Sequence, residues 1–176
     1  MAVFLRRLAP AAVLALAALT VAPSGASAAT DGPTLTIDAS PAGHLGLTWS
    51  VLGQRGTSVH VGTDSLSNPY LGDTAPGTEL PVLCIRVDDR PAPDGIPTSG
   101  FHSWAGGEVA ATDPTAGSDL TGRDVGDGLC ADTFGGDWRM AEFHDGEGWS
   151  LWATGSLPQG TRFWTAIDDQ PADPWS

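Results

Sequence analysis

The sequence predicts an α+β domain built mostly from short antiparallel strands, with one helix pinned to a strand by a single disulfide. Short runs of alternating apolar and polar residues, separated by Gly and Pro turns, are typical of strands. One stretch, 121–134, has apolar residues near helical spacing and is followed by two glycines. The chain has only two cysteines, Cys84 and Cys130, in a strand-like and a helix-like segment respectively.

The first 28 residues have the features of a secretory signal peptide. Arg6 and Arg7 form a charged start, residues 8–21 are apolar, and residues 26–28 form a small-residue cleavage site. The apolar stretch is shorter than the roughly 20 residues that cross a bilayer. We therefore expect a secreted, extracellular protein that is not inserted in a membrane once residues 1–28 are removed.

The charge of the chain excludes some partners. It carries 21 acidic and 8 basic side chains, for a formal charge of −13. Removing the two signal arginines leaves 6 basic residues and a charge of −15. Because phosphate binding needs clustered Lys and Arg, we expect no nucleic-acid partner. An anionic membrane surface is disfavoured for the same reason.

Residues 29–80 form an N-terminal β-rich segment and a candidate subdomain. Alternating runs around Leu35, Leu47 and Val59 predict strands within 34–62, and Gly- and Pro-containing turns separate them. Residues 63–80 are predicted to form a loop.

Residues 81–176 form a disulfide-containing, Trp-rich α+β module. A strand is predicted over 81–87, and a Pro-rich loop follows over 88–100. The helix is expected to begin near Thr121, with Asp124 completing a capping box. Three short strands are predicted over 138–143, 149–154 and 161–167, before a final acidic turn.

An exported chain meets oxidising conditions, so a Cys84–Cys130 disulfide is the default expectation. It would close a loop of 47 residues, worth about 4 kcal/mol on the chain-entropy model. The alternative is two free thiols with a redox or metal role, although the chain has no C-x-x-C spacing.

The densest group of polar residues lies within 138–146. Glu142 follows Trp138 and Met140 on one strand face, an apolar setting that suits a general acid or base. His144 and Asp145 at the strand end could relay a proton or bind a metal. In the structural alternative, Arg139 and Glu142 pair with opposite charges and His144 caps a turn.

The final turn carries Asp168, Asp169, Gln170 and Asp173. Clustered carboxylates beside an amide are oxygen ligands of the kind that Ca²⁺ prefers, so this turn is the candidate metal site. Its spacing is not that of an EF-hand loop, and the alternative is a solvated acidic turn. No other cofactor is expected.

Tryptophan occurs seven times, mostly in the C-terminal half. Trp149 and Trp152 are an odd number of residues apart, so one of them is expected to face solvent. An exposed Trp beside acidic and amide groups suits stacking on a sugar ring. The alternative is that most indoles fill the core. The candidate ligand-binding residues are Trp152, Trp164, Arg139 and Gln170.

Three segments carry a resemblance to a known family. The runs 80–85, 135–146 and 163–171 resemble small secreted proteins common in actinobacteria, whose members often carry the label "flagellar hook-length control protein". The resemblance spans residues 45–176. A hook-length function itself is not expected, because such proteins are long and flexible, lack disulfides and have no cleaved signal.

The chain also resembles C-type-lectin-like domains more loosely. In both, a helix bearing a Cys precedes a strand, and a late Trp-rich strand leads to an acidic Gln-Pro turn. This resemblance implies sugar or Ca²⁺ binding. Here the turn reads Gln170-Pro171-Ala172-Asp173, one residue longer than the lectin Gln-Pro-Asp motif, and the second lectin disulfide is absent.

These observations predict a secreted, non-catalytic binding domain for carbohydrate or another cell-surface ligand. The chain contains no G-x-S-x-G, H-E-x-x-H, phosphate-loop or dinucleotide motif. One alternative is a secreted hydrolase that uses Glu142 with His144 or Asp145. A further alternative is an envelope-associated structural protein.

Overall fold

Strands β1 (Thr48–Arg55) and β2 (Ser58–Gly62) form a hairpin, and they open the part of the chain that the computed structural model describes, residues 44–175. Gly56 stands in its turn at φ 56°, a backbone conformation that glycine adopts without strain. The signal peptide predicted over 1–28 and the strand predicted around Leu35 lie outside the described residues.

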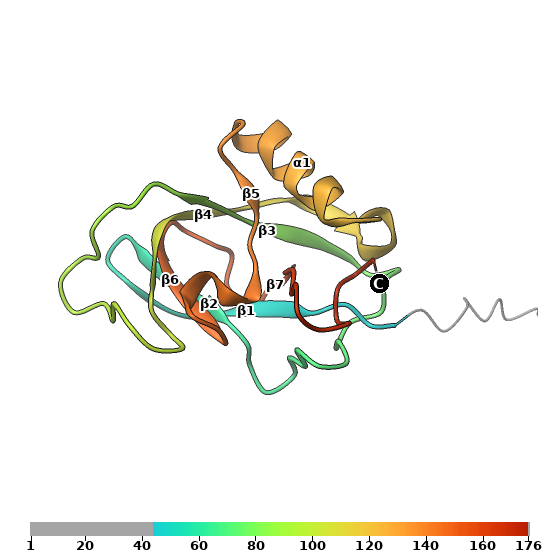
Figure 1. Cartoon of the computed structure of the whole chain (residues 1–176), viewed down its shortest axis with the longest axis horizontal. Helices are drawn as coiled ribbons and strands as arrows, with labels where there is room; N and C mark the ends of the chain where they lie inside the picture. Colours follow the sequence, from blue (N-terminus) through green and yellow to red (C-terminus); the bar gives the residue numbers. More distant parts are fainter. Residues whose placement is uncertain (1–43, 176) are drawn as a thin grey trace, which may run out of the picture. The chain divides into compact units, whose positions relative to one another are not determined.

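Six strands close on themselves into a barrel, an arrangement that the sequence pattern does not predict (Figure 1). The further strands are β3 (Glu79–Val87), β4 (Trp104–Ala116), β6 (Ser150–Thr154) and β7 (Arg162–Trp164). The order is β4-β6-β2-β1-β7-β3, and β3 pairs with β4 to complete the ring. Most pairs are antiparallel, but β3–β7 and β4–β6 are parallel.

The described part of the N-terminal segment belongs to this same barrel. Strand β1 pairs with β7, and β2 pairs with β6. The short strand β5 (Arg139–Met140) pairs with β3 at Cys84 and Ile85, next to the place where β7 pairs with Val82. Strands from residues 44–80 and from 81–175 therefore share one sheet.

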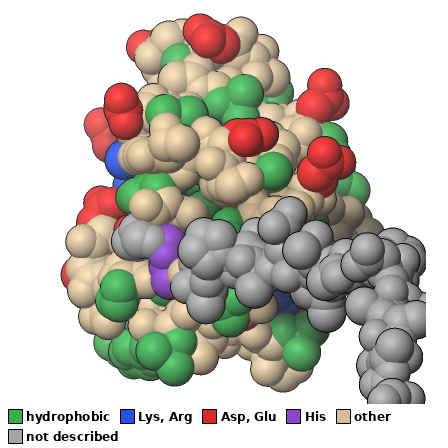
Figure 2. Space-filling view, turned by 90° about the vertical axis from the view of Figure 1, so that its right-hand side faces the viewer, with side chains coloured by type: hydrophobic (Ala, Val, Ile, Leu, Met, Phe, Trp, Pro, Cys, Tyr) green, Lys and Arg blue, Asp and Glu red, His purple; other side chains and the backbone are tan. Residues whose placement is uncertain are grey.

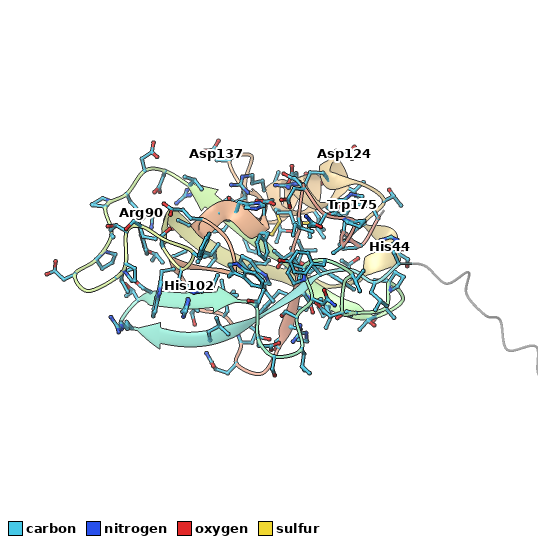
Figure 3. All side chains as sticks on the ribbon, turned by 60° about the horizontal axis from the view of Figure 1, so that its bottom comes forward. His44, Arg90, His102, Asp124, Asp137 and Trp175 are labelled. Atoms are coloured by element: carbon cyan, nitrogen blue, oxygen red, sulfur yellow. A yellow bond between two sulfur atoms is a disulfide. The ribbon has the colours of Figure 1, made fainter. Side chains whose placement is uncertain are left out.

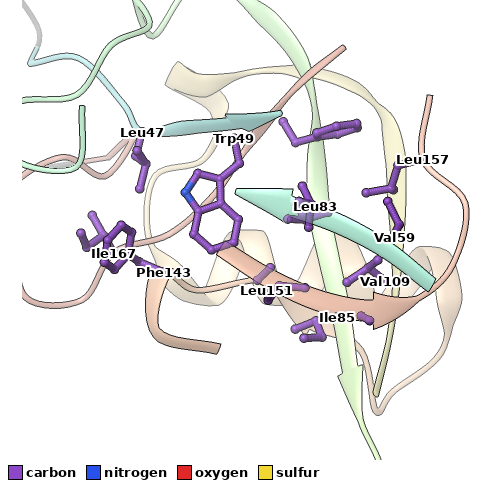
Figure 4. Packing of buried hydrophobic residues seen from close by; sticks show 14 of the residues in the cluster. Leu47, Trp49, Val59, Leu83, Ile85, Val109, Phe143, Leu151, Leu157 and Ile167 are labelled. Carbon is purple, nitrogen blue, oxygen red and sulfur yellow. The ribbon is translucent and has the colours of Figure 1, made fainter. Parts of the chain in front are cut away.

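The barrel interior is filled around Trp49, which is fully buried (Figure 4). Phe143 and Ile167 lie on one side of its ring, and the aliphatic residues of β2, β3, β4 and β6 lie on the other. Alternation along each strand explains this, since Val59 and Val61 point inward while His60 points outward. A second cluster outside the barrel contains Val82, Cys84, Leu120, Cys130, Trp138, Met140, Trp164 and Ala166.

Helix α1 (Arg123–Phe134) covers this second cluster. The predicted disulfide is confirmed: Cys84 of β3 is bonded to Cys130 of α1, with 5.6 Å between their Cα atoms. The predicted capping box is wrong, because the N-cap residue is Gly122 and makes no side-chain cap bond. Gly126 lies against Met140, so this glycine lets the helix approach β5 closely.

The structure confirms the mostly stranded fold with one helix and corrects several boundaries. The thirteen-residue strand β4 was not predicted; its Gly, Ala and Pro residues have low β-propensity. The 3₁₀ helices η1 (Gly117–Asp119) and η2 (Phe143–Gly146) were also missed. Helix η2 ends the strand predicted over 138–143, because Glu142 acts as its N-cap.

The charged groups of this protein are mostly acidic. On the face in Figure 2, acidic side chains stand out at several separate places, while basic ones emerge only in small spots. No helix within residues 44–175 is long and apolar enough to span a membrane.

Candidate functional site

A pocket of about 260 Å³ lies beside η2, where four irregular segments of the chain meet. These segments are the loop after β2, the loop before β4, the turn from η2 to β6, and the turn after β7. The pocket is lined by Pro69, Tyr70, Phe101, Phe143, His144, Glu147, Gly148, Trp149, Ile167, Asp169 and Gln170.

Its walls include three large aromatic side chains that solvent reaches. Phe101 is 64% exposed, Tyr70 is 56% exposed and Trp149 is 37% exposed. The ring centres of Tyr70 and Trp149 are 6.5 Å apart in an edge-to-face arrangement. Phe143 links this surface to the core, with its ring centre 5.6 Å from Trp149 and 6.0 Å from Trp49. Burying these exposed rings against a ligand would be favourable.

The turn that presents Trp149 has an unusual backbone. Glu147, Gly148 and Trp149 all have positive φ, at 63°, 104° and 64°. Only the glycine adopts this region without a steric penalty, and for a bulky residue it is an outlier. The carbonyl oxygen of Trp149 accepts hydrogen bonds from the backbone N–H of Thr63 at 2.8 Å and from its hydroxyl at 3.1 Å. Thr63, just after β2, therefore holds the turn in place.

The loop that carries Tyr70 is anchored by a partly buried charged network. Arg162 of β7 donates to both carboxylate oxygens of Asp64, at 2.8 and 2.9 Å, and to Asp73 at 3.3 Å. Burial raises the pKa of Asp64, but hydrogen bonds from Ser50 and Arg162 outweigh it and hold that pKa well below its usual value. Arg162 thus ties both ends of the loop to the barrel.

The base of the pocket is built on Glu142, whose side chain is nearly buried. Its carboxylate accepts from the backbone N–H of His144 at 2.6 Å and from that of Asp168 at 3.1 Å. It also lies 3.0 Å from Nδ1 of His144. An ionised carboxylate only accepts, so beside an ionised Glu142 the ring would donate through Nδ1, and a neutral ring would then keep Nε2 as an acceptor. This Nε2 lies 3.8 Å from Asp169.

Asp145 and Arg139 support the same turn from behind. Asp145 accepts from the backbone N–H of Glu142 at 2.7 Å, which completes the capping box of η2. Arg139 donates to both of its oxygens, at 2.5 and 3.0 Å, and this pairing raises the pKa of Arg139. Neither side chain lines the pocket. Both position the residues that do.

The three carboxylates of the acidic turn after β7 have different partners and do not converge on one site. Asp168 pairs with Arg123 at 2.9 Å, and Asp169 lines the pocket with Gln170. Asp173 is turned inward and accepts from the backbone N–H of Ile167 at 3.0 Å, and burial raises its pKa. Within residues 44–175 no three His, Cys, Asp or Glu side chains gather closely enough to hold a metal ion. The Ca²⁺ hypothesis for this turn stays a prediction.

Two candidate tryptophans are covered. Trp164 is fully buried and donates its indole N–H to the carbonyl oxygen of Thr115 at 3.1 Å, so no ring face is left for a ligand. Trp152 is 8% exposed, because the His60 ring stacks on it and Arg55 lies 5.6 Å from its ring centre. One of Trp149 and Trp152 was expected to face solvent, and it is Trp149 that is partly exposed and lines the pocket.

A second polar cluster lies under the loop that precedes β4. His60 and His102 both place a ring nitrogen 2.7 Å from the hydroxyl oxygen of Ser150. The His60 ring also stacks on Trp152, its partner across the strands, with ring centres 4.5 Å apart and 4° between planes. In Figure 3, His102 lies far from His44 and Trp175, at the end of the domain that carries Arg90. Ser150 is fully buried and His102 is exposed, so this cluster fastens the loop before β4 to strands β2 and β6.

The structure thus brings together His144, Asp169 and Gln170 of the predicted candidates, with Glu142 beneath them. Sequence reasoning missed Tyr70 and Phe101 as aromatic walls, since both are single residues in loops without periodicity. The sequence feature that could have identified them is that each is a large aromatic residue among turn-forming residues. Comparisons with protein-family models, with curated proteins and with solved structures found no match for this chain.

Proposed function

We propose that this protein is a secreted, non-catalytic binding domain that recognises carbohydrate through the pocket beside η2. The observation that carries the proposal is the combination of three exposed aromatic rings with carboxylate and amide groups in one concave site. Sugar rings present apolar faces that stack on aromatic side chains, and hydroxyl groups that need hydrogen-bond partners. The pocket offers both kinds of contact.

The lining suits this role in detail. Trp149 and Tyr70 meet edge to face, so one can lie under a sugar ring while the other borders it. Asp169 and Gln170 supply acceptors and a donor at the rim. The disulfide and the predicted signal peptide support an extracellular setting, where polysaccharides and cell-surface glycans are available.

The proposal is tested by screening the mature chain on a glycan array and measuring the affinity of any hit by calorimetry. Tyr70→Ala should weaken binding at least about tenfold, because it removes an exposed aromatic contact without touching the core. The matched control is Leu66→Ala, which truncates an exposed residue of the same loop outside the pocket. Equal affinity of both variants for the hit would contradict the pocket assignment.

One observation favours a hydrolase as the second candidate. Glu142 orients His144 through Nδ1, so Nε2 faces the pocket as a candidate general base. No Ser, Thr or Cys lines this pocket, so the group that His144 would activate as a general base is a water molecule. Turnover of a polysaccharide or peptide panel, lost in both His144→Gln and Glu142→Gln variants that keep the native melting temperature, would establish this activity.

The third hypothesis is an envelope-associated structural protein. It would gain support if the array gave no hit and the panel gave no turnover. Fractionation of the producing cells would then place the protein with the envelope, whereas the binding proposal leaves it in the medium or on the glycan that it recognises.

A further inference from the structure

Two carboxylates in the pocket, those of Glu147 and Asp169, have no arginine or lysine partner in the described part of this chain. Glu147 accepts only the backbone N–H of Gly100 at 2.7 Å, and Asp169 has only His144 nearby, at 3.8 Å. No lysine occurs anywhere in the sequence. The arginines within residues 44–175 all have other partners: Arg55 bonds Gly95, Arg86 and Arg90 pair with Asp88 and Glu108, Arg123 pairs with Asp127 and Asp168, Arg139 pairs with Asp145, and Arg162 pairs with Asp64 and Asp73.

The aromatic walls of the pocket also favour a positively charged ligand. The faces of Trp, Tyr and Phe rings attract cations, and Trp does so most strongly. Trp149, Tyr70 and Phe101 line the same pocket as the two carboxylates, and their rings also favour positive charge. The chain as a whole carries a formal charge of −13, so its field draws cationic ligands toward the pocket and repels acidic ones.

We infer that the ligand is an amino sugar with a free, protonated amine, carried on an oligosaccharide. This inference rests on the proposed function and narrows its ligand class. The amine would lie between Glu147 and Asp169 while the sugar ring stacks on Trp149 or Tyr70. A neutral sugar would fill the same space without neutralising the carboxylates of Glu147 and Asp169, and these carboxylates would repel an acidic sugar.

The test compares two oligomers that differ only at nitrogen. Titration calorimetry of the full mature chain with the glucosamine hexamer at pH 6 should give an affinity about 10- to 100-fold tighter than with the N-acetylglucosamine hexamer, the factor expected from charged hydrogen bonds. Raising NaCl to about 0.5 M should reduce this ratio, because salt screens exposed charges.

Two double variants test whether the preference for the glucosamine hexamer comes from the pocket. The double variant Glu147→Gln, Asp169→Asn should lower the ratio of the two affinities to below about threefold. Each side chain keeps its shape in this variant, and the amide oxygen introduced at position 147 can still accept from the backbone N–H of Gly100. The control Asp124→Asn, Asp137→Asn removes the same charge from side chains that do not line the pocket, so it should leave the ratio unchanged.

The outcomes separate the inference from the proposed function. Equal binding of both hexamers, or a preference that survives the double variant, would overturn the amine assignment and leave the carbohydrate proposal standing. Binding of neither hexamer, together with a hit for a neutral glycan on the array, would also overturn the amine assignment alone. No glycan binding in any format would overturn both.

Discussion

Replacing His60 by Gln should remove a specific part of the acid sensitivity of this protein. His60 lies on the outside of β2, stacked on Trp152 and within 2.7 Å of the hydroxyl of Ser150. Burial, with a smaller contribution from the charge of His102, lowers the pKa of His60 from 6.5 to about 4. Arg55, which lies over Trp152, is the other cationic group on this side. The folded protein thus keeps the His60 ring neutral.

The sign and size of the effect follow from this pKa. Because the unfolded chain binds the proton more readily, the stabilising contribution of a neutral His60 is complete above pH 6.5 and is lost as the pH falls toward 4. A difference of about 2.5 pKa units corresponds to about 3 kcal/mol, and the partial exposure of the ring reduces this to about 1–3 kcal/mol.

The assay is urea unfolding followed by tryptophan fluorescence, at pH values from about 7.5 to about 3.5, for the wild type and His60→Gln. The carboxylates and the other histidines are present in both proteins, so the difference in unfolding free energy isolates His60. We expect that difference to shrink by about 1–3 kcal/mol as the pH falls from 6.5 to 4. A difference that stays constant with pH would refute the reasoning, and NMR titration of the His60 ring would show directly whether it protonates near pH 4.

Four further predictions test the supports of the barrel and of the pocket. Removing the disulfide in Cys84→Ala, Cys130→Ala should lower the unfolding free energy by about 4 kcal/mol, measured in urea, because the denatured chain loses a closed loop; a loss below about 1 kcal/mol would contradict this. In helix α1, Gly128→Ala should stabilise by up to about 1 kcal/mol through helix propensity, since nothing lies within 4 Å of the added carbon. The matched change Gly126→Ala should instead destabilise by about 1–2 kcal/mol, because its Cβ would lie 2.6 Å from Sδ of the buried Met140. Equal thermal shifts for both alanine variants would show that the helix does not pack as described. Arg162→Met should cost about 3 kcal/mol by leaving Asp73 buried without its cation, and it should weaken ligand binding by loosening the Tyr70 loop; unchanged stability would argue against the network. If the acidic turn holds Ca²⁺, millimolar Ca²⁺ should raise the melting temperature above its value in chelator, and an unchanged melting temperature would remove the acidic-turn hypothesis.

Local patterns predicted the elements that depend on local chemistry. The strand over 81–87 and the helix before Gly135-Gly136 follow from alternation and from helical spacing with a glycine stop. The disulfide followed from having only two cysteines in an exported chain. Barrel closure could not be predicted in this way, because the parallel pairs β3–β7 and β4–β6 join residues far apart in sequence and leave no local pattern.

The site was predicted in part for a similar reason. Parity along the strand indicated that Trp149 and Trp152 lie on opposite sides, but it could not say which side a loop covers. Trp152 is covered by the stacked ring of His60 and by Arg55, which also bonds the carbonyl of Gly95 in the loop over 88–103. Tyr70 reaches the pocket only because Arg162, almost a hundred residues later, holds its loop.

The position of Trp149 is hard to explain by stability. Its φ of 64° costs an L-residue about 1–3 kcal/mol, and a glycine would adopt it freely. Its ring adds little to the barrel core, which Trp49 and Phe163 already fill, and it remains 37% exposed. Two hydrogen bonds from Thr63 nevertheless hold its carbonyl, so the turn keeps this backbone conformation. The strained turn thus places an exposed indole in the same pocket as the carboxylates of Glu147 and Asp169, which fits the proposed binding role.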